Sequence, residues 1–198
     1  QVSAVAGGRG YRRGADTAWE LVELHPLPDP RTLTATMLGA EEAPIPSLPA
    51  VKTCGALAHV LCAAAAERRG VHEAVRTAAG LLLEASASNL FWEADGELYT
   101  PSDSLPLYPG VTRSVVIREA RRAGWIVHEG EFDPRVLESA GGAFLTNAVR
   151  GLEPIAELDG TPLDWPATLE ALRATVEEAR IEGGLPVADG AGPSDGTR

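Results

Sequence analysis

The stretch LLLEASASNLFWEADGELYTP, residues 81–101, carries the strongest fold signal in the sequence. Its two apolar runs flank Asp95-Gly96, a dipeptide that favours a tight hairpin turn, so we expect two antiparallel strands here. The apolar residues at 81–83 should be buried, and Glu84 follows them directly. A buried carboxylate is costly unless it is paired with a cation. Glu84 therefore either pairs with a positive group or lies at a strand end facing water.

Outside this stretch, short apolar runs alternate with helical periodicity, which favours a mixed α/β (α+β) domain. Strands are expected over residues 17–25, 32–38, 125–127, 142–149 and 152–158, and helices over 57–70, 112–124, 133–139 and 168–181. Thr112 is expected to cap the second helix, and Gly70 stands where the first should stop. We expect one domain over residues 1–182. The small, polar, proline-interrupted tail at 183–198 is expected to be disordered.

The composition narrows the class of protein. The chain has 198 residues, of which 44% are hydrophobic and 23% are charged, as in ordinary globular domains. A net charge of −11 argues against a nucleic-acid partner, and no apolar run approaches the roughly 18 residues of a membrane span. Cys54 and Cys62 have no second cysteine pair, and the histidines have no partners at ligand spacing, so no metal site is expected. Free thiols fit a cytoplasmic protein.

The segment PAVKTCGAL, residues 49–57, contains the one lysine among the 17 lysine and arginine residues of the chain. A guanidinium cannot lose its proton near neutral pH or condense with an aldehyde, whereas an amine can do both. Lys52 is therefore either present by chance in a composition biased toward arginine or retained because its amine has a chemical role. The commonest covalent role of such a lysine is a Schiff base with a carbonyl or with pyridoxal phosphate (PLP).

A PLP site needs an amine, a carboxylate for the pyridine nitrogen and a site for the phosphate. Lys52 and Glu84 supply candidates for the first two. The segment PGVTR, residues 109–113, puts a glycine and two backbone amides at a helix start, which is a ready anion site, although most such starts bind only water. His59 follows Lys52 by seven residues, or two helical turns, so it lies on roughly the same face and can approach this site.

From Gly7 to about Leu158 the chain resembles the large domain of fold-type IV PLP enzymes, which have the D-amino-acid aminotransferase-like fold, and most of all aminodeoxychorismate lyase. The motifs that carry the resemblance occur in matching order and spacing: GGRGY at 7–11, VK at 51–52, EASASNLFW at 84–92, YTP at 99–101, PGVTR at 109–113, and TNAV at 146–149 with EPI beyond. GGRGY, NLFW and TNAV favour the lyase, because branched-chain and D-amino-acid aminotransferases usually have a glycine-threonine or serine-threonine pair where this chain has Asn147-Ala148.

The resemblance implies a role for each matching residue. Lys52 would bind PLP covalently and act as the catalytic base, and Glu84 would pair with the pyridine nitrogen. The phosphate would be held by Val111, Thr112 and Ala148, largely through backbone amides, with Asn147 beside it. Arg9 and Tyr11 would face the amino substrate, although Arg9 in a solvated loop is the plainer interpretation. Leu57 stands where aminotransferases of this superfamily often have tyrosine, as in the lyase pattern.

The resemblance also implies how the whole protein works. The expected reaction converts 4-amino-4-deoxychorismate to 4-aminobenzoate and pyruvate, in folate biosynthesis, and a homodimer is the usual state. The smaller amino-terminal domain of the family, with its phosphate-clamping arginine, is not found in these 198 residues. A class IV aminotransferase acting on branched-chain or D-amino acids is the alternative. A catalytically silent fragment, kept for dimer contacts, is a second alternative from a different class.

Overall fold

The computed structural model describes residues 2–4, 18–20, 31–42, 44–45, 51–52 and 56–182. Its strands are β1 (Val2–Ala4), β2 (Ala18–Glu20), β3 (Leu33–Leu38), β4 (Glu73–Ala78), β5 (Leu81–Ala85), β6 (Asn89–Ala94), β7 (Glu97–Pro101), β8 (Val127–Gly130), β9 (Gly142–Asn147), β10 (Gly151–Leu158) and β11 (Thr161–Pro162). Its helices are α1 (Leu57–Arg68), α2 (Val111–Arg122), the short 3₁₀ helix η1 (Pro134–Ser139) and α3 (Ala167–Glu182). The mixed α/β class expected from the sequence is confirmed.

Nine strands form one curled, mixed sheet, in the order β5-β4-β3-β10-β9-β6-β7-β8 with β11 paired to β10, while β1 and β2 form a separate antiparallel pair. The pairs β3–β4, β3–β10 and β7–β8 are parallel, and the other pairs of the large sheet are antiparallel. Because the sheet curls, its edge strand β5 returns toward the middle strand β6, where the Ala85 amide donates to the Ser88 carbonyl at 2.8 Å. Glu84 and Asn89 are thereby brought together.

The hairpin expected at Asp95-Gly96 is present between β6 and β7. Both turn residues have positive φ, at 53° and 78°, which explains the preference for this dipeptide. A second hairpin joins β4 to β5 through Ala79-Gly80, with φ of 51° and 77°. This turn has no comparable sequence signal, and neither it nor β4 was among the expected elements.

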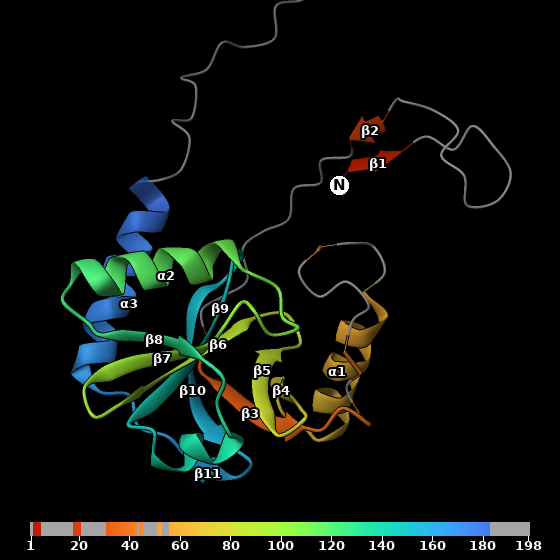
Figure 1. Ribbon diagram of the computed structural model, residues 1–198, viewed down its shortest axis with the longest axis horizontal. Helices are drawn as coiled ribbons and strands as arrows, with labels where there is room; N and C mark the ends of the chain where they lie inside the picture. Colours follow the sequence, from red (N-terminus) through yellow and green to blue (C-terminus); the bar gives the residue numbers. More distant parts are fainter. Residues whose placement is uncertain are drawn as a thin grey trace, which may run out of the picture.

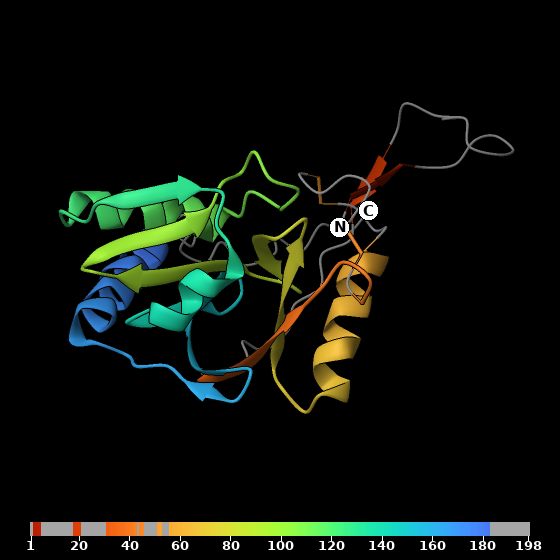
Figure 2. The ribbon, with the colours of Figure 1, turned by 60° about the horizontal axis from the view of Figure 1, so that its bottom comes forward.

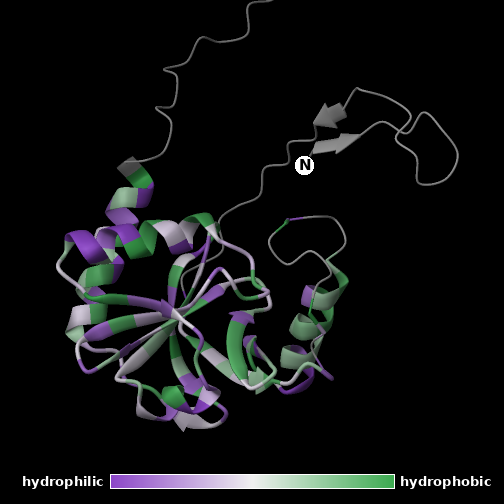
Figure 3. Cartoon of the chain, in the orientation of Figure 1, coloured by the Kyte–Doolittle hydropathy of each residue, from purple (hydrophilic) through white to green (hydrophobic). Residues whose placement is uncertain are grey.

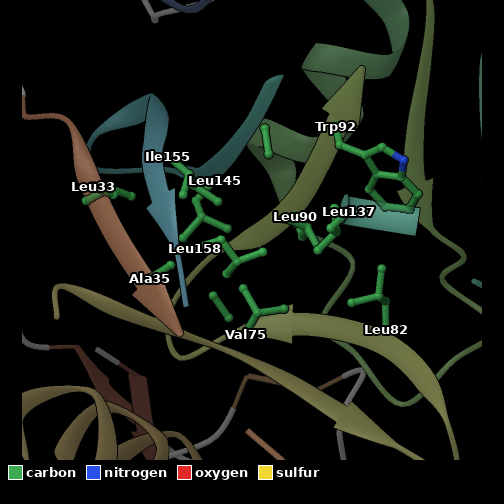
Figure 4. Close-up of a cluster of buried hydrophobic side chains, with 12 residues drawn as sticks. Leu33, Ala35, Val75, Leu82, Leu90, Trp92, Leu137, Leu145, Ile155 and Leu158 are labelled. Atoms are coloured by element: carbon green, nitrogen blue, oxygen red, sulfur yellow. The ribbon is translucent and has the colours of Figure 1, made fainter. Parts of the chain in front are cut away.

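The inner face of the sheet encloses the main hydrophobic core (Figure 4). Side chains from β3, β4, β5, β6, β9 and β10 meet there, and Leu137 of η1 closes one side. Trp92 is fully buried in this core, edge-on to Phe132 at 4.9 Å between ring centroids. This core fixes the curl of the sheet, and the curl positions the strand ends that carry polar residues.

Helices α2 and α3 lie together on the outer face of the sheet, away from α1 (Figures 1 and 2). Phe91 and Phe144 stack beneath them at 5.1 Å between ring centroids. The predicted α3 stripe of Leu169, Leu172 and Val176 is buried against this layer. The expectation that Thr112 caps α2 is wrong: Gly110 is the N-cap, with no side-chain cap bond, and Thr112 is the second helical residue.

Helix α1 packs on β3 and β4 through small side chains, namely Ala58, Cys62, Ala65 and Ala66. They allow a close approach to the sheet, and the buried Cys62 is a free thiol. The larger residues whose spacing predicts this helix lie on its other side: Leu57 and Val60 are 67% and 59% exposed. Figure 3 shows hydrophobic colouring along most of α1. The helix is therefore apolar on both its packed and its open sides.

The helix ends at Arg68, and Gly70 follows with φ of 72°, as the sequence predicts. The strand expected at 125–127 begins two residues later, as β8. The expected tail, 183–198, lies outside the described residues. Within the part of the chain that the structure describes, no helix is long and apolar enough to cross a membrane.

Candidate active site

Glu84 is buried at the end of β5, with its side chain 5% exposed. Its Oε2 accepts a hydrogen bond from the backbone N–H of Tyr108 at 2.9 Å and a longer one from Nδ2 of Asn89 at 3.4 Å. Its Oε1 lies 2.6 Å from Nη2 of Arg76. Burial raises the pKa of the Glu84 carboxyl to about 7, against the lowering effects of the Tyr108 N–H and the Arg76 charge. The alternative in which Glu84 faces water is wrong.

Arg76 lies on β4, beside Glu84 across the β4–β5 hairpin, and its side chain is fully buried. Its Nε and Nη1 have no hydrogen-bond partner among the described residues. The cation that a buried Glu84 requires is thus already present in the protein. Arg76 was not predicted as a site residue from the sequence, because an arginine in a short strand is normally exposed.

His59 approaches this pair from the first turn of α1. Lys52 lies before that helix, so the helical spacing that suggested this approach does not account for it. Its Nε2 lies 3.5 Å from Oε1 of Glu84. Burial lowers the pKa of His59, and the positive charges of Arg76 and Lys52 lower it further. The neutral imidazole is therefore favoured beside Glu84.

Lys52 is exposed, and its Nζ lies 5.3 Å from the centroid of the Tyr108 ring. Tyr108 joins the two candidate residues: its ring faces the Lys52 amine and its backbone N–H binds Glu84. The amine and the carboxylate expected to act together therefore lie against the same residue. Tyr108 was not identified from the sequence, because its role depends on how the loop 102–110 folds back over β5.

The start of α2 is fixed against β6 by Asn89. Its Nδ2 donates to the Tyr108 carbonyl at 2.7 Å, and its Oδ1 occupies the space that a Cβ at Gly110 would need. Gly110 is extended, with φ −66° and ψ 142°, and no side chain caps the helix. Val111 is exposed and Thr112 is buried. The first amides of α2 are thus free of side-chain caps, which suits an anion.

The end of β9 lies opposite the start of β6, where Thr146 pairs with Asn89. Thr146 is buried, and its Oγ1 has no hydrogen-bond partner among the described residues. The next residue, Asn147, donates from Nδ2 to Oγ of Ser88 at 3.0 Å and accepts at Oδ1 from the amides of Val149 and Arg150. Its side chain therefore holds the turn at the end of β9.

The following residue, Ala148, is exposed, and its carbonyl accepts from Nη2 of Arg180 at 3.0 Å. Its own N–H lies in the turn that Asn147 shapes, beside the strand end that carries Thr146. The remaining predicted site residues, Arg9 and Tyr11, lie outside the described residues. Among the residues that are described, no three histidine, cysteine, aspartate or glutamate side chains are grouped so that they could hold a metal ion.

Solved structures that this chain resembles include aminotransferases and an enzyme described as a lyase. An aminotransferase from Brucella abortus bound to the cofactor PLP superposes with a TM-score of 0.71 and 27% identity, over 80% of this chain and 58% of that one. A "Putative 4-amino-4-deoxychorismate lyase" from Legionella pneumophila gives a TM-score of 0.80 with 19% identity, over 89% of this chain and 67% of that one, a likeness of fold alone. The expected large-domain fold is confirmed.

The family model for amino-transferase class IV matches residues 1–158. The chain belongs to the class IV aminotransferase family. A "Putative branched-chain-amino-acid aminotransferase" from Methanocaldococcus jannaschii is 28% identical over 173 residues, which are 85% of this chain and 60% of the relative. The chain thus spans about three fifths of the length of that curated relative.

Proposed function

We propose that this chain is the cofactor-binding part of a PLP-dependent lyase that converts 4-amino-4-deoxychorismate to 4-aminobenzoate and pyruvate. The observation that best supports PLP as the cofactor is that Lys52 and Glu84 both contact Tyr108, the first at its ring and the second at its backbone N–H. Membership of the class IV family and the PLP-bound Brucella relative support the cofactor.

The residues present fit PLP on features of their own. Glu84 is a buried acceptor with hydrogen-bond capacity left for a ring nitrogen. The Thr146 hydroxyl, next to Asn89, has no hydrogen-bond partner in the described part of the chain, and Asn89 contacts the start of α2, which no side chain caps. A phosphate needs several donors converging in this way. In this proposal Lys52 binds the aldehyde, Glu84 the ring nitrogen, and the amides at Val111, Thr112 and Ala148 the phosphate.

When bound, PLP supplies an aldehyde that condenses with amines and a ring that withdraws electrons from the carbon bearing the substrate nitrogen. Lys52 would bind the aldehyde and, when freed by the substrate amine, would accept a proton from that carbon. Glu84 holds a proton at the ring nitrogen, and Arg9 and Tyr11 bind the substrate carboxylates. Asn147 shapes the turn that presents the Ala148 amide. Cleavage of the bond between the ring and the enolpyruvyl oxygen would leave the aromatic 4-aminobenzoate, and the released enolpyruvyl group would take up a proton to become pyruvate.

The lyase is proposed ahead of an aminotransferase on the motifs GGRGY, NLFW and TNAV and on Leu57 in place of tyrosine. A class IV aminotransferase is the second candidate, favoured by the names of the archaeal and Brucella relatives. Both reactions use the same base and the same carboxylate, so these groups do not distinguish them.

Product analysis tests the proposal. The purified chain is incubated with PLP and aminodeoxychorismate, and separately with D-alanine or leucine plus a 2-oxo acid. We expect equimolar pyruvate and 4-aminobenzoate from the first mixture and none with Lys52→Ala. Amino-group transfer in the second mixture alone would favour the aminotransferase. If neither mixture reacts and no visible absorbance band forms with PLP, the chain is a silent fragment.

We also propose that the chain forms a homodimer in the cytoplasm through the open side of α1. Leu57, Val60 and Leu61 make an exposed apolar stripe there, and such stripes are normally covered by a partner. Val60→Asp should convert a dimer to a monomer in sedimentation experiments. Ile181→Asp, a matched change at an exposed isoleucine on α3, should not. A wild-type monomer would reject the dimer.

A further inference from the structure

Arg76 is an unusual feature of the candidate site. Its guanidinium is 0% exposed, yet two of its nitrogens have no hydrogen-bond partner in the described part of the chain. Buried arginines are rare unless they are paired, and a buried pair with unsatisfied donors is seldom the best way to stabilise a fold. Within that part of the chain, Glu84 is the carboxylate that forms an ion pair with Arg76. The role of Arg76 should therefore be sought in what it does to Glu84.

The groups around Glu84 come from each element packed against it. Arg76 of β4 touches Oε1 at 2.6 Å, and His59 of α1 lies 3.5 Å from the same oxygen. The charge of Lys52 also lowers the pKa of Glu84. The remaining contacts are neutral donors, the Tyr108 N–H and the Asn89 amide. The single negative charge of Glu84 is thus already matched by Arg76 before any ligand binds.

A protonated pyridine nitrogen at Glu84 would be an additional cation beside this carboxylate. Arginine keeps its charge throughout the pH range in which proteins are folded, so Arg76 always opposes that extra positive charge. The repulsion is strong because the pair is buried and water cannot screen it. Arg76 also favours the ionised form of Glu84. Both effects act in the same direction, since Arg76 favours loss of the proton from the Glu84 carboxyl and also from the ring nitrogen.

We propose that Arg76 is a positioning residue of the cofactor site, which shares the Glu84 carboxylate with the ring nitrogen of PLP and so weakens the hold of that nitrogen on its proton. The proposal rests on the function proposed above, because it places the ring nitrogen at Glu84. Its consequence is that the electron-withdrawing power of the bound ring depends on pH near neutrality. A purely structural Arg76 would affect stability without changing where these groups titrate.

The test compares three variants with the wild-type chain. Arg76→Gln keeps a hydrogen-bond donor near Glu84 and removes the charge, whereas Arg76→Lys keeps the charge and changes the shape. Arg173→Gln is the matched control, because Arg173 forms an exposed ion pair with Glu170 on α3. Circular dichroism checks that each variant is folded.

Two titrations are recorded by NMR. In the cofactor-free chain, the ¹³C carboxyl resonance of Glu84, assigned by its loss in Glu84→Gln, reports the ionisation of that carboxylate. In the loaded chain, ¹⁵N-labelled PLP reports the protonation of its ring nitrogen. We expect Arg76→Gln to raise both midpoints by about one to three pH units, the usual effect of one nearby charge. Arg76→Lys should restore them, and Arg173→Gln should leave them unchanged.

Unchanged midpoints in a folded Arg76→Gln would overturn the proposal. If Arg76→Gln does not fold, the titrations of the wild type and of Arg76→Lys decide. A Glu84 carboxyl that stays protonated above about pH 8 beside Arg76 would contradict the proposal. Midpoints near neutrality that agree between the wild type and Arg76→Lys would support it. A wild-type chain that never binds PLP would reject the proposed function together with the sharing of Glu84. The cofactor-free titration would then still decide whether Arg76 controls Glu84.

Discussion

Replacing Gly110 with alanine places a methyl group where the Asn89 side chain now lies. The added Cβ would overlap Oδ1 of Asn89, with Cγ of the same side chain at 3.4 Å, while Cβ of Arg113 stays at an ordinary 3.6 Å. Gly110 has a φ of −66°, so alanine meets no backbone strain there. The predicted cost is therefore one of overpacking, about 1–3 kcal/mol. Asn89→Ala should also cost about 1–3 kcal/mol, because it removes the 2.7 Å bond to the Tyr108 carbonyl.

The double variant decides whether these two residues act through each other. With Asn89 shortened, the methyl at position 110 has room, so Gly110→Ala should cost only what alanine loses against glycine at a helix N-cap, about 0.5–1 kcal/mol. Urea unfolding followed by circular dichroism should thus give a coupling energy of about 1–2 kcal/mol. Gly124→Ala is the control for additivity, because Gly124 lies just past the far end of α2 with nothing within 4 Å of its added Cβ. Its cost comes from a φ of 90° and should be the same whether or not Asn89 is shortened. Costs at 89 and 110 that add within about 0.5 kcal/mol would refute the view that their contact positions the start of α2.

Three further predictions follow from the same geometry. Glu84→Gln should fold but lose about a hundredfold or more in turnover, because a neutral amide cannot pair with a charged ring nitrogen; steady-state kinetics checks this. Burial raises the pKa of Glu84 from 4.5 to about 7, so the folded state holds this proton more tightly than the unfolded state. Glu84 should therefore stabilise the cofactor-free fold below about pH 4.5. This contribution, at most about 3 kcal/mol, should be lost as the pH rises through 7. Urea unfolding at several pH values measures it, and a Glu84→Gln profile parallel to that of the wild type would contradict it. Phe144→Ala should cost about 3–5 kcal/mol by thermal or urea unfolding, since it empties a fully buried site stacked on Phe91, and a loss under 1 kcal/mol would mean that this layer can collapse.

Local signals were enough to predict part of the fold. Asp95-Gly96 gave the β6–β7 hairpin because both residues tolerate the positive φ that the turn requires. The α3 stripe was predicted because its three large side chains all face the sheet. The packed side of α1 was harder to identify. There the residues that touch the sheet are alanines and a cysteine, which add little to a hydrophobic pattern, while the leucines lie outside.

The candidate site was predictable only where the sequence itself is exceptional. Lys52 was found because it is the one lysine, and Glu84 because it follows three leucines. Arg76 and Asn89 carry no such signal, since their roles depend on the Ala79-Gly80 turn and on the return of β5 toward β6. Tyr108 acts through a backbone N–H, which no residue type encodes. Contacts of this kind follow from chain topology, so sequence patterns could not have placed them.

Covalent capture tests the central claim that Lys52 binds the cofactor. The chain is incubated with PLP, reduced with borohydride to make the linkage permanent, digested and mapped by mass spectrometry. We expect a pyridoxyl group on the peptide that contains Lys52, since no other lysine is present. Labelling of the terminal amine alone, or of nothing, would contradict it.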